Sequence, residues 1–340
     1  MNPVVSVVIV NLNRRELLER CLQSLGEQTF SKFEIIVVDN GSTDGSVEFL
    51  QSASEARMRI VLLPANKGFA GGCNEGIRMA EGRYIATLNN DAEAETRWLE
   101  ELVTGIESDS SVGMCASKIL FHDDHKRIDK VGHLIYPDGL NHGRGSGETD
   151  HGQFERREEV LFPDGAAALY RRKMLDVIGV FDERFFAYGD DADLGLRGRL
   201  AGWNCLYIPT AIVYHHHSAT AGEFSALKAF LIERNRIWVA VKTFPPALLA
   251  ASPFFTLLRF AYHAYGSLFL VGSSGQYAAE CSRMNLALMM LKAYWSGLKF
   301  FPEMWRSRRK IRQFARLPNR DFAALIRRHR ITLRALTLGA

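Results

Sequence analysis

Residues 4–10 read VVSVVIV, a short run of mainly β-branched side chains. Such a run is typical of a strand that is buried on both faces. Leucines and Cys21 follow at helical spacing over 16–25, and FEIIVV at 33–38 is a second buried strand. The alternation continues with helix signals at 46–51 and 72–80 and strand signals at 59–63 and 84–88. This pattern predicts an α/β fold, in which flanking helices cover a mostly parallel central sheet.

Polar residues fall where these predicted strands end. They are Asn11 and Asn13, then Asp39, then Asn66, Lys67 and Gly68, and finally Asn89, Asn90 and Asp91. In parallel α/β sheets, ligands bind in the crevice beyond the carboxyl ends of the strands. Asp39 could accept hydrogen bonds from a base or a ribose, and Lys67 could meet a phosphate. The alternative is that these residues make turns and cap the helices that follow.

A second group of carboxylates comes later in the chain, where Asp190, Asp191 and Asp193 lie within four residues. Clustered carboxylates repel one another, which raises the proton affinity of at least one of them and suits a general base. The alternative is helix capping with an Asp193–Arg197 ion pair, and both roles can hold at once.

Metal ligands can also be proposed from residue type. Asp91 offers the carboxylate oxygen that a hard divalent cation prefers, although an N-cap role competes. A histidine from the run 215–217, which follows another predicted strand, could complete such a metal site.

Composition and charge narrow the function classes. The 340-residue chain is 24% charged and 47% hydrophobic, which excludes a disordered protein. Its net charge of +4 is uneven, because the residues from Trp305 onward contain eleven Lys or Arg and one acidic residue. This basic tail therefore carries +10 and the rest of the chain −6. The chain lacks a P-loop, a GxGxxG strand-to-helix turn, a GxSxG motif and an HExxH motif, which disfavours the corresponding chemistries.

We divide the chain into a catalytic domain at 1–222 and a helical region at 223–340. A polar insertion at 122–160 is expected to form a long loop or hairpin whose histidines are exposed. The apolar stretch 247–272 is interrupted by Pro253, Arg259 and His263. It therefore predicts two short helices at a membrane surface rather than one spanning helix.

Three roles are open for the helical region. The favoured one is peripheral attachment to the anionic cytoplasmic face of the inner membrane, where each Lys or Arg contributes about 1 kcal/mol. The others are packing on the catalytic domain and formation of a homodimer. Nucleic acid is not an expected partner, because no aromatic–basic recognition motif accompanies the arginines.

Seven segments, in order along residues 1–240, resemble family 2 glycosyltransferases, which are inverting enzymes with the GT-A nucleotide-sugar fold. They are VSVVIVNLNR at 5–14, IIVVDNGSTDGS at 35–46, NKGFAGGCNEG at 66–76, ATLNNDA at 86–92, GAAALYRR at 165–172, VIGVFDERFFAYGDDADLGLRGRLAGW at 177–203 and VYHHHSAT at 213–220. The details are most similar to the bacterial rhamnosyltransferase-like branch, which builds cell-envelope polysaccharide on lipid-linked acceptors.

The resemblance implies roles for individual residues. Asp191 becomes the catalytic base, with Asp190 as its alternate. Asp91 stands at the last position of the family's DxD motif and would hold Mg²⁺ or Mn²⁺, and His215 matches a histidine near that metal. Asn89 stands where many relatives have the first Asp of the motif. The implied nucleotide-sugar contacts are Asn11, Asn13, Asp39, Asn66, Lys67, Gly68, Asn89 and Asn90.

The resemblance implies an inverting transfer of a sugar, with rhamnose as one candidate, from a nucleotide-diphosphate donor to a glycan or lipid-linked acceptor. Two rival readings are a sugar-phosphate nucleotidyltransferase and a non-catalytic scaffold at a membrane surface. The first would need an early glycine-rich, basic phosphate loop in place of VNLNRRE at 10–16, and the second does not explain the aspartate cluster.

Overall fold

The computed structural model describes residues 3–53, 56–216, 226–269 and 283–338. The chain divides into two compact units. The first comprises Met1–His133 and Gly143–Thr220, and the second comprises Leu134–His142 and Ala221–Ala340. The predicted boundary between residues 222 and 223 lies outside the described residues. Residues 134–142, which the sequence placed in the catalytic domain with the rest of the insertion, group with the second unit.

A ten-stranded sheet forms the centre of the first unit. Its main path runs β10-β12-β6-β11-β4-β1-β2-β3, with β5 paired to β12 and β7 paired to β6. The strands are β1 Val5–Asn11, β2 Phe33–Asp39, β3 Met58–Leu62, β4 Tyr84–Leu88, β5 Ala92–Ala94, β6 Val112–Phe121, β7 Ile128–Lys130, β10 Glu158–Glu159, β11 Ala167–Arg171 and β12 Asn204–His215. β1 to β4 pair in parallel, as do β6 and β12, whereas β11 is antiparallel to both of its neighbours. The prediction of a mostly parallel sheet is confirmed.

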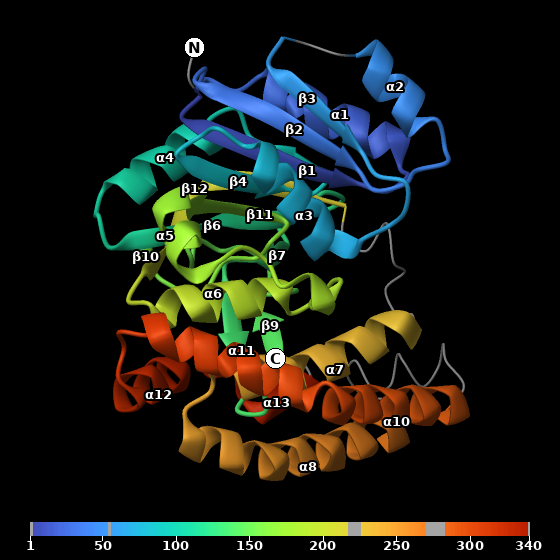
Figure 1. Cartoon of the computed structure of the whole chain (residues 1–340), viewed down its shortest axis with the longest axis vertical. Helices are drawn as coiled ribbons and strands as arrows, with labels where there is room; N and C mark the ends of the chain where they lie inside the picture. Colours follow the sequence, from blue (N-terminus) through green and yellow to red (C-terminus); the bar gives the residue numbers. More distant parts are fainter. Residues whose placement is uncertain (1–2, 54–55, 217–225, 270–282, 339–340) are drawn as a thin grey trace. The chain divides into compact units, whose positions relative to one another are not determined.

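Helices cover both faces of this sheet (Figure 1). They are α1 Arg15–Gly26, α2 Ser46–Ser52, α3 Gly68–Met79, α4 Trp98–Glu107, α5 Arg172–Ile178 and α6 Asp190–Leu200, with a short 3₁₀ helix at Glu183–Phe185. Alternate residues of β1 face opposite ways: Val7 belongs to the core shared with α1 and α4, whereas Val8 and Val10 meet α3. This two-sided burial explains the run VVSVVIV at 4–10.

The insertion at 122–160 is not the exposed loop or simple hairpin that the sequence predicted. It contributes β7 and β10 to the main sheet and also contains a two-stranded pair, β8 His133–Ile135 and β9 Asn141–Gly143. Apolar side chains such as Ile128 and Val131 are fully buried, and His133 is 4% exposed. Apolar residues among the polar ones therefore make much of the insertion part of the folded interior and not an exposed loop.

Apart from residues 134–142, the described part of the second unit consists of helices and the segments that connect them. Its helices are α7 Ala226–Thr243, α8 Pro246–Phe269, α10 Arg283–Lys299, α11 Phe301–Phe314, α12 Asn319–Arg328 and α13 Leu333–Leu338. α7 packs against α10 and α11, and α8 packs against α13. The described residues of 247–272 form one helix rather than the two predicted, since α8 continues through Pro253. None of the described helices is long and apolar enough to cross a membrane.

Candidate active site

The carboxyl ends of β1, β2 and β4 bring three predicted nucleotide contacts together. Asn11 Nδ2 donates hydrogen bonds to Asp39 Oδ2 at 3.0 Å and to Ser42 Oγ at 3.1 Å. Asn90 Nδ2 donates to Asn11 Oδ1 at 2.8 Å, so the ends of the three strands are joined through side chains. Asp39 Oδ1 accepts from the backbone N–H of Ser42, which is the turn role named as its alternative. Asn13 Oδ1 accepts from the Thr43 N–H, so the first two loops are also tied together.

The loop from Asn66 to Gly68 is held by side-chain amides. Asn40 Nδ2 donates to Asn66 Oδ1 at 3.0 Å, and Asn40 Oδ1 accepts from the Lys67 N–H at 2.9 Å. The Lys67 ammonium lies 2.7 Å from Glu75 Oε1 on α3, the helix that this loop begins. Lys67 is partly exposed, and this surface ion pair contributes little energy, so a phosphate could replace Glu75 as its partner.

Gly68 is required by its surroundings. Its φ is +74°, and a Cβ there would lie 2.3 Å from the carbonyl oxygen of Phe186. Phe186 and Tyr188, in the segment before α6, also have positive φ values of 68° and 65°. Non-glycine residues in this region store about 1–3 kcal/mol each, and such strain is commonly found at functional sites.

Asp91 and His215 form a buried pair where β4 and β12 end. Asp91 Oδ1 is 3.2 Å from His215 Nε2, and His215 Nδ1 is 2.7 Å from Asp129 Oδ2. Burial raises the pKa of Asp91, but His215 outweighs it and holds that pKa below its ordinary value. For His215, Asp129 and Asp91 outweigh the effect of burial and raise the pKa to about 10.

This pair fits a divalent cation. Asp91 Oδ1 is buried, and apart from its ion pair with His215 it accepts no hydrogen bond among the described residues. The Asp91 carboxylate oxygen and His215 Nε2 face one another. Asp129 binds the other ring nitrogen of His215 and orients the imidazole, as carboxylates commonly do for histidines that bind metals. Because the His215 pKa is raised, a cation that takes Nε2 must displace a proton. Asn89, at the first position of the DxD motif, places Nδ2 3.4 Å from His215 Nε2.

Asp190 and Asp191 occupy the first turn of α6, where the helix dipole favours negative charge. Asp190 is 3% exposed, and its Oδ2 has no hydrogen-bond partner among the described residues. Burial and the neighbouring Asp191 raise the pKa of Asp190 well above its usual value. Burial also raises the pKa of Asp191, while His133 opposes this rise. The predicted Asp193–Arg197 ion pair is present at 2.8 Å.

Residues of the insertion, together with Asp164 just after it, supply a chain of charged contacts between these two pairs of residues. Lys130 Nζ lies 3.8 Å from Asp129 Oδ1 and 2.9 Å from Asp164 Oδ2. His133 Nε2 lies 2.9 Å from Asp164 Oδ2 and 3.6 Å from Asp191 Oδ2. The path therefore runs from the metal-type pair at Asp91 to the base candidate at Asp191 without leaving the first unit.

The sequence reasoning missed these insertion residues. The sequence prediction named none of four residues as site residues: Asp129, Lys130, His133 and Asp164. It assigned every histidine of the insertion, His133 included, to an exposed loop. The sequence signal was limited to the apolar residues Ile128, Val131 and Ile135, which indicate burial of this part of the insertion, but their spacing of three and four residues does not indicate strands.

Comparison with known proteins identifies the family. The sequence profile of glycosyl transferase family 2 matches residues 6–179, about half of the chain. The chain therefore belongs to glycosyl transferase family 2, and it is a glycosyltransferase.

Individual relatives refine this assignment. The N-acetylglucosaminyl-diphospho-decaprenol L-rhamnosyltransferase of Mycobacterium tuberculosis H37Rv is 32% identical over 276 residues, which cover 70% of this chain and 87% of that protein. The O-antigen biosynthesis protein RfbC of Myxococcus xanthus is 27% identical over 255 residues, or 72% of this chain, but the match covers only 19% of RfbC. These likenesses place the chain in the rhamnosyltransferase-like branch.

Solved structures confirm the GT-A fold. A mannosyltransferase of Pyrobaculum calidifontis, determined in complex with GDP-Man and Mn²⁺, superposes with a TM-score of 0.53 at 18% identity. The superposition covers 92% of this chain and 86% of the mannosyltransferase.

Proposed function

We propose that this glycosyltransferase moves a sugar, with inversion, from a nucleotide-diphosphate donor to a hydroxyl group of a glycan or lipid-linked acceptor in cell-envelope polysaccharide synthesis. The observation that carries the proposal is the linkage of two pairs, Asp91–His215 and Asp190–Asp191, through Asp129, Lys130, Asp164 and His133. Family membership favours this reading over a nucleotidyltransferase or a scaffold.

The donor would lie at the carboxyl ends of β1, β2 and β4. Asn11, Asn13, Asp39 and the 66–68 loop would hold its nucleotide, with Asn89 and Asn90 at the diphosphate. Asp91 and His215 would hold Mg²⁺ or Mn²⁺, which when bound neutralises the charge that develops on the leaving diphosphate.

Asp191 would act as the general base. It takes the proton from the acceptor hydroxyl while that oxygen attacks the anomeric carbon from the face opposite the diphosphate. The bond to the nucleoside diphosphate breaks as the new glycosidic bond forms, so the anomeric centre inverts. Asp190, buried and with a raised pKa, is suited to remain protonated beside it. The His133 imidazole opposes the rise in the Asp191 pKa and so favours the ionised form of this base.

The catalytic assignment is tested with Asp191→Asn. We expect turnover to fall by about 10²–10⁴-fold, because general base catalysis is worth that much. Donor affinity, measured by isothermal titration, should change little. Asp190→Asn replaces a protonated carboxyl group by a neutral amide of nearly the same shape, so we expect a smaller loss of turnover than in Asp191→Asn. A larger loss in Asp190→Asn than in Asp191→Asn would exchange the two roles.

The cation assignment is tested with Asp91→Asn. Mn²⁺ binding in the presence of a nucleoside diphosphate, followed by electron paramagnetic resonance, should weaken by at least about tenfold in this variant. Binding as tight as in the unaltered protein would remove Asp91 from the cation site.

The donor and acceptor are proposed by likeness to the mycobacterial rhamnosyltransferase, whose name gives a diphospho-decaprenol acceptor. We propose dTDP-rhamnose as the first donor to test. A hydrolysis and transfer panel of dTDP-, UDP- and GDP-sugars would identify the donor. If only a UDP- or GDP-sugar is turned over, that sugar replaces dTDP-rhamnose as the proposed donor. The protein would still be a glycosyltransferase.

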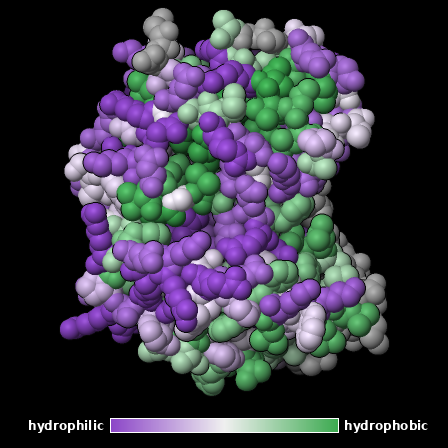
Figure 2. All heavy atoms as spheres, in the orientation of Figure 1, coloured by the Kyte–Doolittle hydropathy of each residue, from purple (hydrophilic) through white to green (hydrophobic). Residues whose placement is uncertain are grey.

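Peripheral attachment to the anionic cytoplasmic face of the inner membrane is the proposed role of the second unit. α8 and α10, which touch through Phe260 and Tyr294, expose large apolar side chains at three- and four-residue spacing. Six of these are 53–72% exposed: Phe254, Leu257, Tyr265, Leu291, Trp295 and Leu298. Figure 2 shows apolar atoms at the lower edge of the drawn face, where Figure 1 places α8.

Charge supports the same proposal. Nine Lys or Arg of the basic tail are exposed: Arg306, Arg309, Lys310, Arg316, Arg320, Arg327, Arg328, Arg330 and Arg334. An apolar face with nearby cations is the pattern of interfacial helices that bind anionic lipid.

Sedimentation with vesicles tests this attachment. We expect co-sedimentation with phosphatidylglycerol vesicles at low salt, little with phosphatidylcholine, and loss in Leu291→Glu/Trp295→Glu. Analytical ultracentrifugation distinguishes the homodimer alternative. The apolar face would be a dimer interface if two results are obtained together. The protein would be a dimer that Leu291→Glu/Trp295→Glu dissociates, and it would not bind vesicles.

A further inference from the structure

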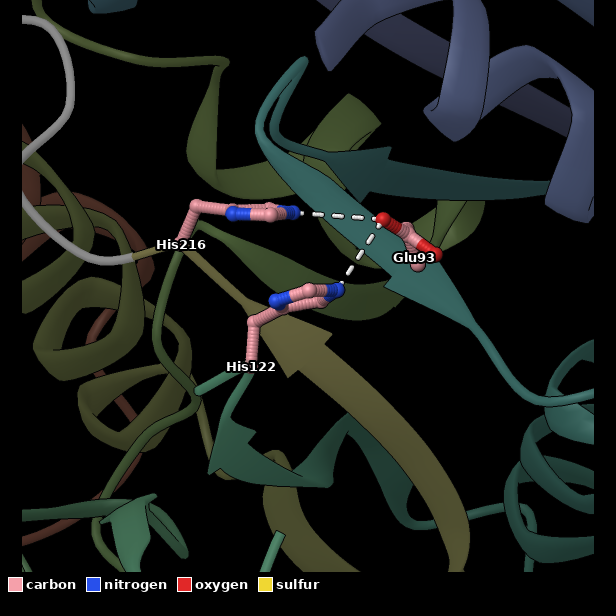
Figure 3. A group of neighbouring side chains, drawn as sticks. All are labelled: Glu93, His122 and His216. Carbon is pink, nitrogen blue, oxygen red and sulfur yellow. Dashed lines mark hydrogen bonds and ion pairs between the residues drawn. The ribbon is translucent and has the colours of Figure 1, made fainter. Parts of the chain in front are cut away.

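Three side chains outside the proposed active site converge on one point in the first unit. Glu93 lies on β5, His122 directly follows β6, and His216 directly follows β12. Figure 3 shows both imidazole rings directed at the Glu93 carboxylate. His122 Nε2 lies 3.4 Å from Glu93 Oε1, and His216 Nε2 lies 3.2 Å from the same oxygen.

The sheet register brings these residues together. β12 lies between β6 and β5, pairing with β6 in parallel and with β5 antiparallel. Phe121 pairs with His215, so the next residues, His122 and His216, leave neighbouring strand ends side by side. Their rings stack with centroids 3.7 Å apart and planes 21° apart. Tyr214 pairs with Glu93, which places the carboxylate two residues back along β12 from His216.

The spacing of the three ligand atoms matches a small cation. The two nitrogens and the carboxylate oxygen all lie within 4.8 Å of one another. Ligand atoms about 2.0–2.1 Å from a tetrahedral Zn²⁺ are about 3.3–3.4 Å apart, close to the two nitrogen–oxygen separations here. His122 Nδ1 also lies 3.3 Å from Asp123 Oδ1, an arrangement that orients metal-bound imidazoles in proteins.

We propose that Glu93, His122 and His216 form a binding site for Zn²⁺ or a similar borderline transition cation, separate from the Mg²⁺ or Mn²⁺ site at Asp91. Two imidazoles and one carboxylate favour Zn²⁺, Co²⁺ or Ni²⁺ over Mg²⁺, which prefers oxygen ligands. The three side chains are 16–29% exposed, so a cation can enter and a water can complete its coordination. The bound cation would tie together the ends of β5, β6 and β12.

Zinc binding by the full-length, tag-free protein tests the site, with Zn²⁺ titrated against a chromophoric chelator. The measurements use the Asp91→Asn background, so that the proposed active-site cation ligand is altered in every sample. We expect one tight Zn²⁺ per chain. Adding His122→Ala or Glu93→Gln should weaken binding by at least about tenfold, since each removes a direct ligand. Thermal unfolding should shift upward with Zn²⁺ before these changes and not after them.

His125→Ala is the matched control. His125 is exposed and three residues from His122, but its ring stacks on Tyr214 and belongs to none of the three ligand positions. Zn²⁺ affinity should therefore be unchanged in His125→Ala. The absence of tight Zn²⁺ before any change in the cluster would overturn the proposal. Undiminished affinity in both His122→Ala and Glu93→Gln would also overturn it and reduce the cluster to imidazole–carboxylate hydrogen bonds.

Discussion

Asp190 and Asp191 are neighbours in the chain but have different surroundings. Asp191 faces His133, whereas Asp190 is buried with one oxygen that has no hydrogen-bond partner among the described residues. Adjacent carboxylates that are both removed from water cannot both ionise easily, so their titrations are coupled. The imidazole beside Asp191 opposes the rise in the Asp191 pKa that burial causes, whereas burial and the neighbouring Asp191 raise the pKa of Asp190. These different surroundings support the different roles proposed for two identical side chains.

This difference predicts a pH profile. A base must be ionised to work, so activity is lost as pH falls through its pKa. Burial raises the pKa of Asp191, so the acid limb of kcat should lie above the ordinary aspartate pKa of about 3.9. His133 opposes that rise, and His133→Asn should move the limb to still higher pH. His151→Asn, on an exposed residue, should leave it in place. If His133→Asn does not move the acid limb, His133 does not influence the pKa of the catalytic base.

At the scale of elements, the glycines of α3 decide how closely this helix approaches the sheet. A Cβ on Gly72 would lie 2.5 Å from Val10 Cγ1, and a Cβ on Gly76 would lie 2.4 Å from Val8 Cγ1. The two glycines are four residues apart, on the same face of α3. Close packing here also fixes where α3 begins, and its first residue is Gly68 of the proposed donor loop.

We therefore expect Gly76→Ala to destabilise the first unit by about 1–3 kcal/mol, the usual range for overpacking a core. Urea unfolding followed by far-ultraviolet circular dichroism measures this change. Gly26→Ala is the control, because that glycine also lies in a helix but has no atom within 4 Å of an added Cβ. Equal stabilities of the two variants would mean that α3 moves away from β1 without cost.

These elements also show what the sequence could predict. β1 to β4 and their helices follow from strong local patterns, and the proposed donor residues lie at the ends of those strands because topology requires it. The insertion could not be placed in this way. β7 and β10 have three and two residues, too short for a period to be visible, and β12, the partner of β10, is distant in sequence. His133 and Asp164 therefore join the site through tertiary contacts that no local pattern records.

At the scale of the whole molecule, the second unit is built around charge as well as apolar packing. Asp138, from the short segment 134–142, lies 2.8 Å from Arg259 on α8. Glu233 on α7 lies 2.7 Å from Arg236 and 2.8 Å from Arg259. All four side chains are at most 9% exposed, so two anions and two cations neutralise one another inside the unit. This network explains why a segment of the insertion belongs to the helical unit.

Removing one charge from this network should be costly. We expect Glu233→Gln to lower the free energy of unfolding of the second unit by about 3–5 kcal/mol at neutral pH, because it leaves the two buried arginines Arg236 and Arg259 to share the single carboxylate of Asp138. Burial raises the pKa of Glu233, but Arg236 and Arg259 outweigh it and lower the pKa to about 2. A lowered pKa stabilises the fold above the unfolded-state pKa of about 4.3, and this contribution disappears as pH falls through about 2. The stability difference between the unaltered protein and Glu233→Gln should therefore shrink over that window. A difference that is constant from pH 7 to pH 2 would mean that Glu233 acts through packing rather than charge.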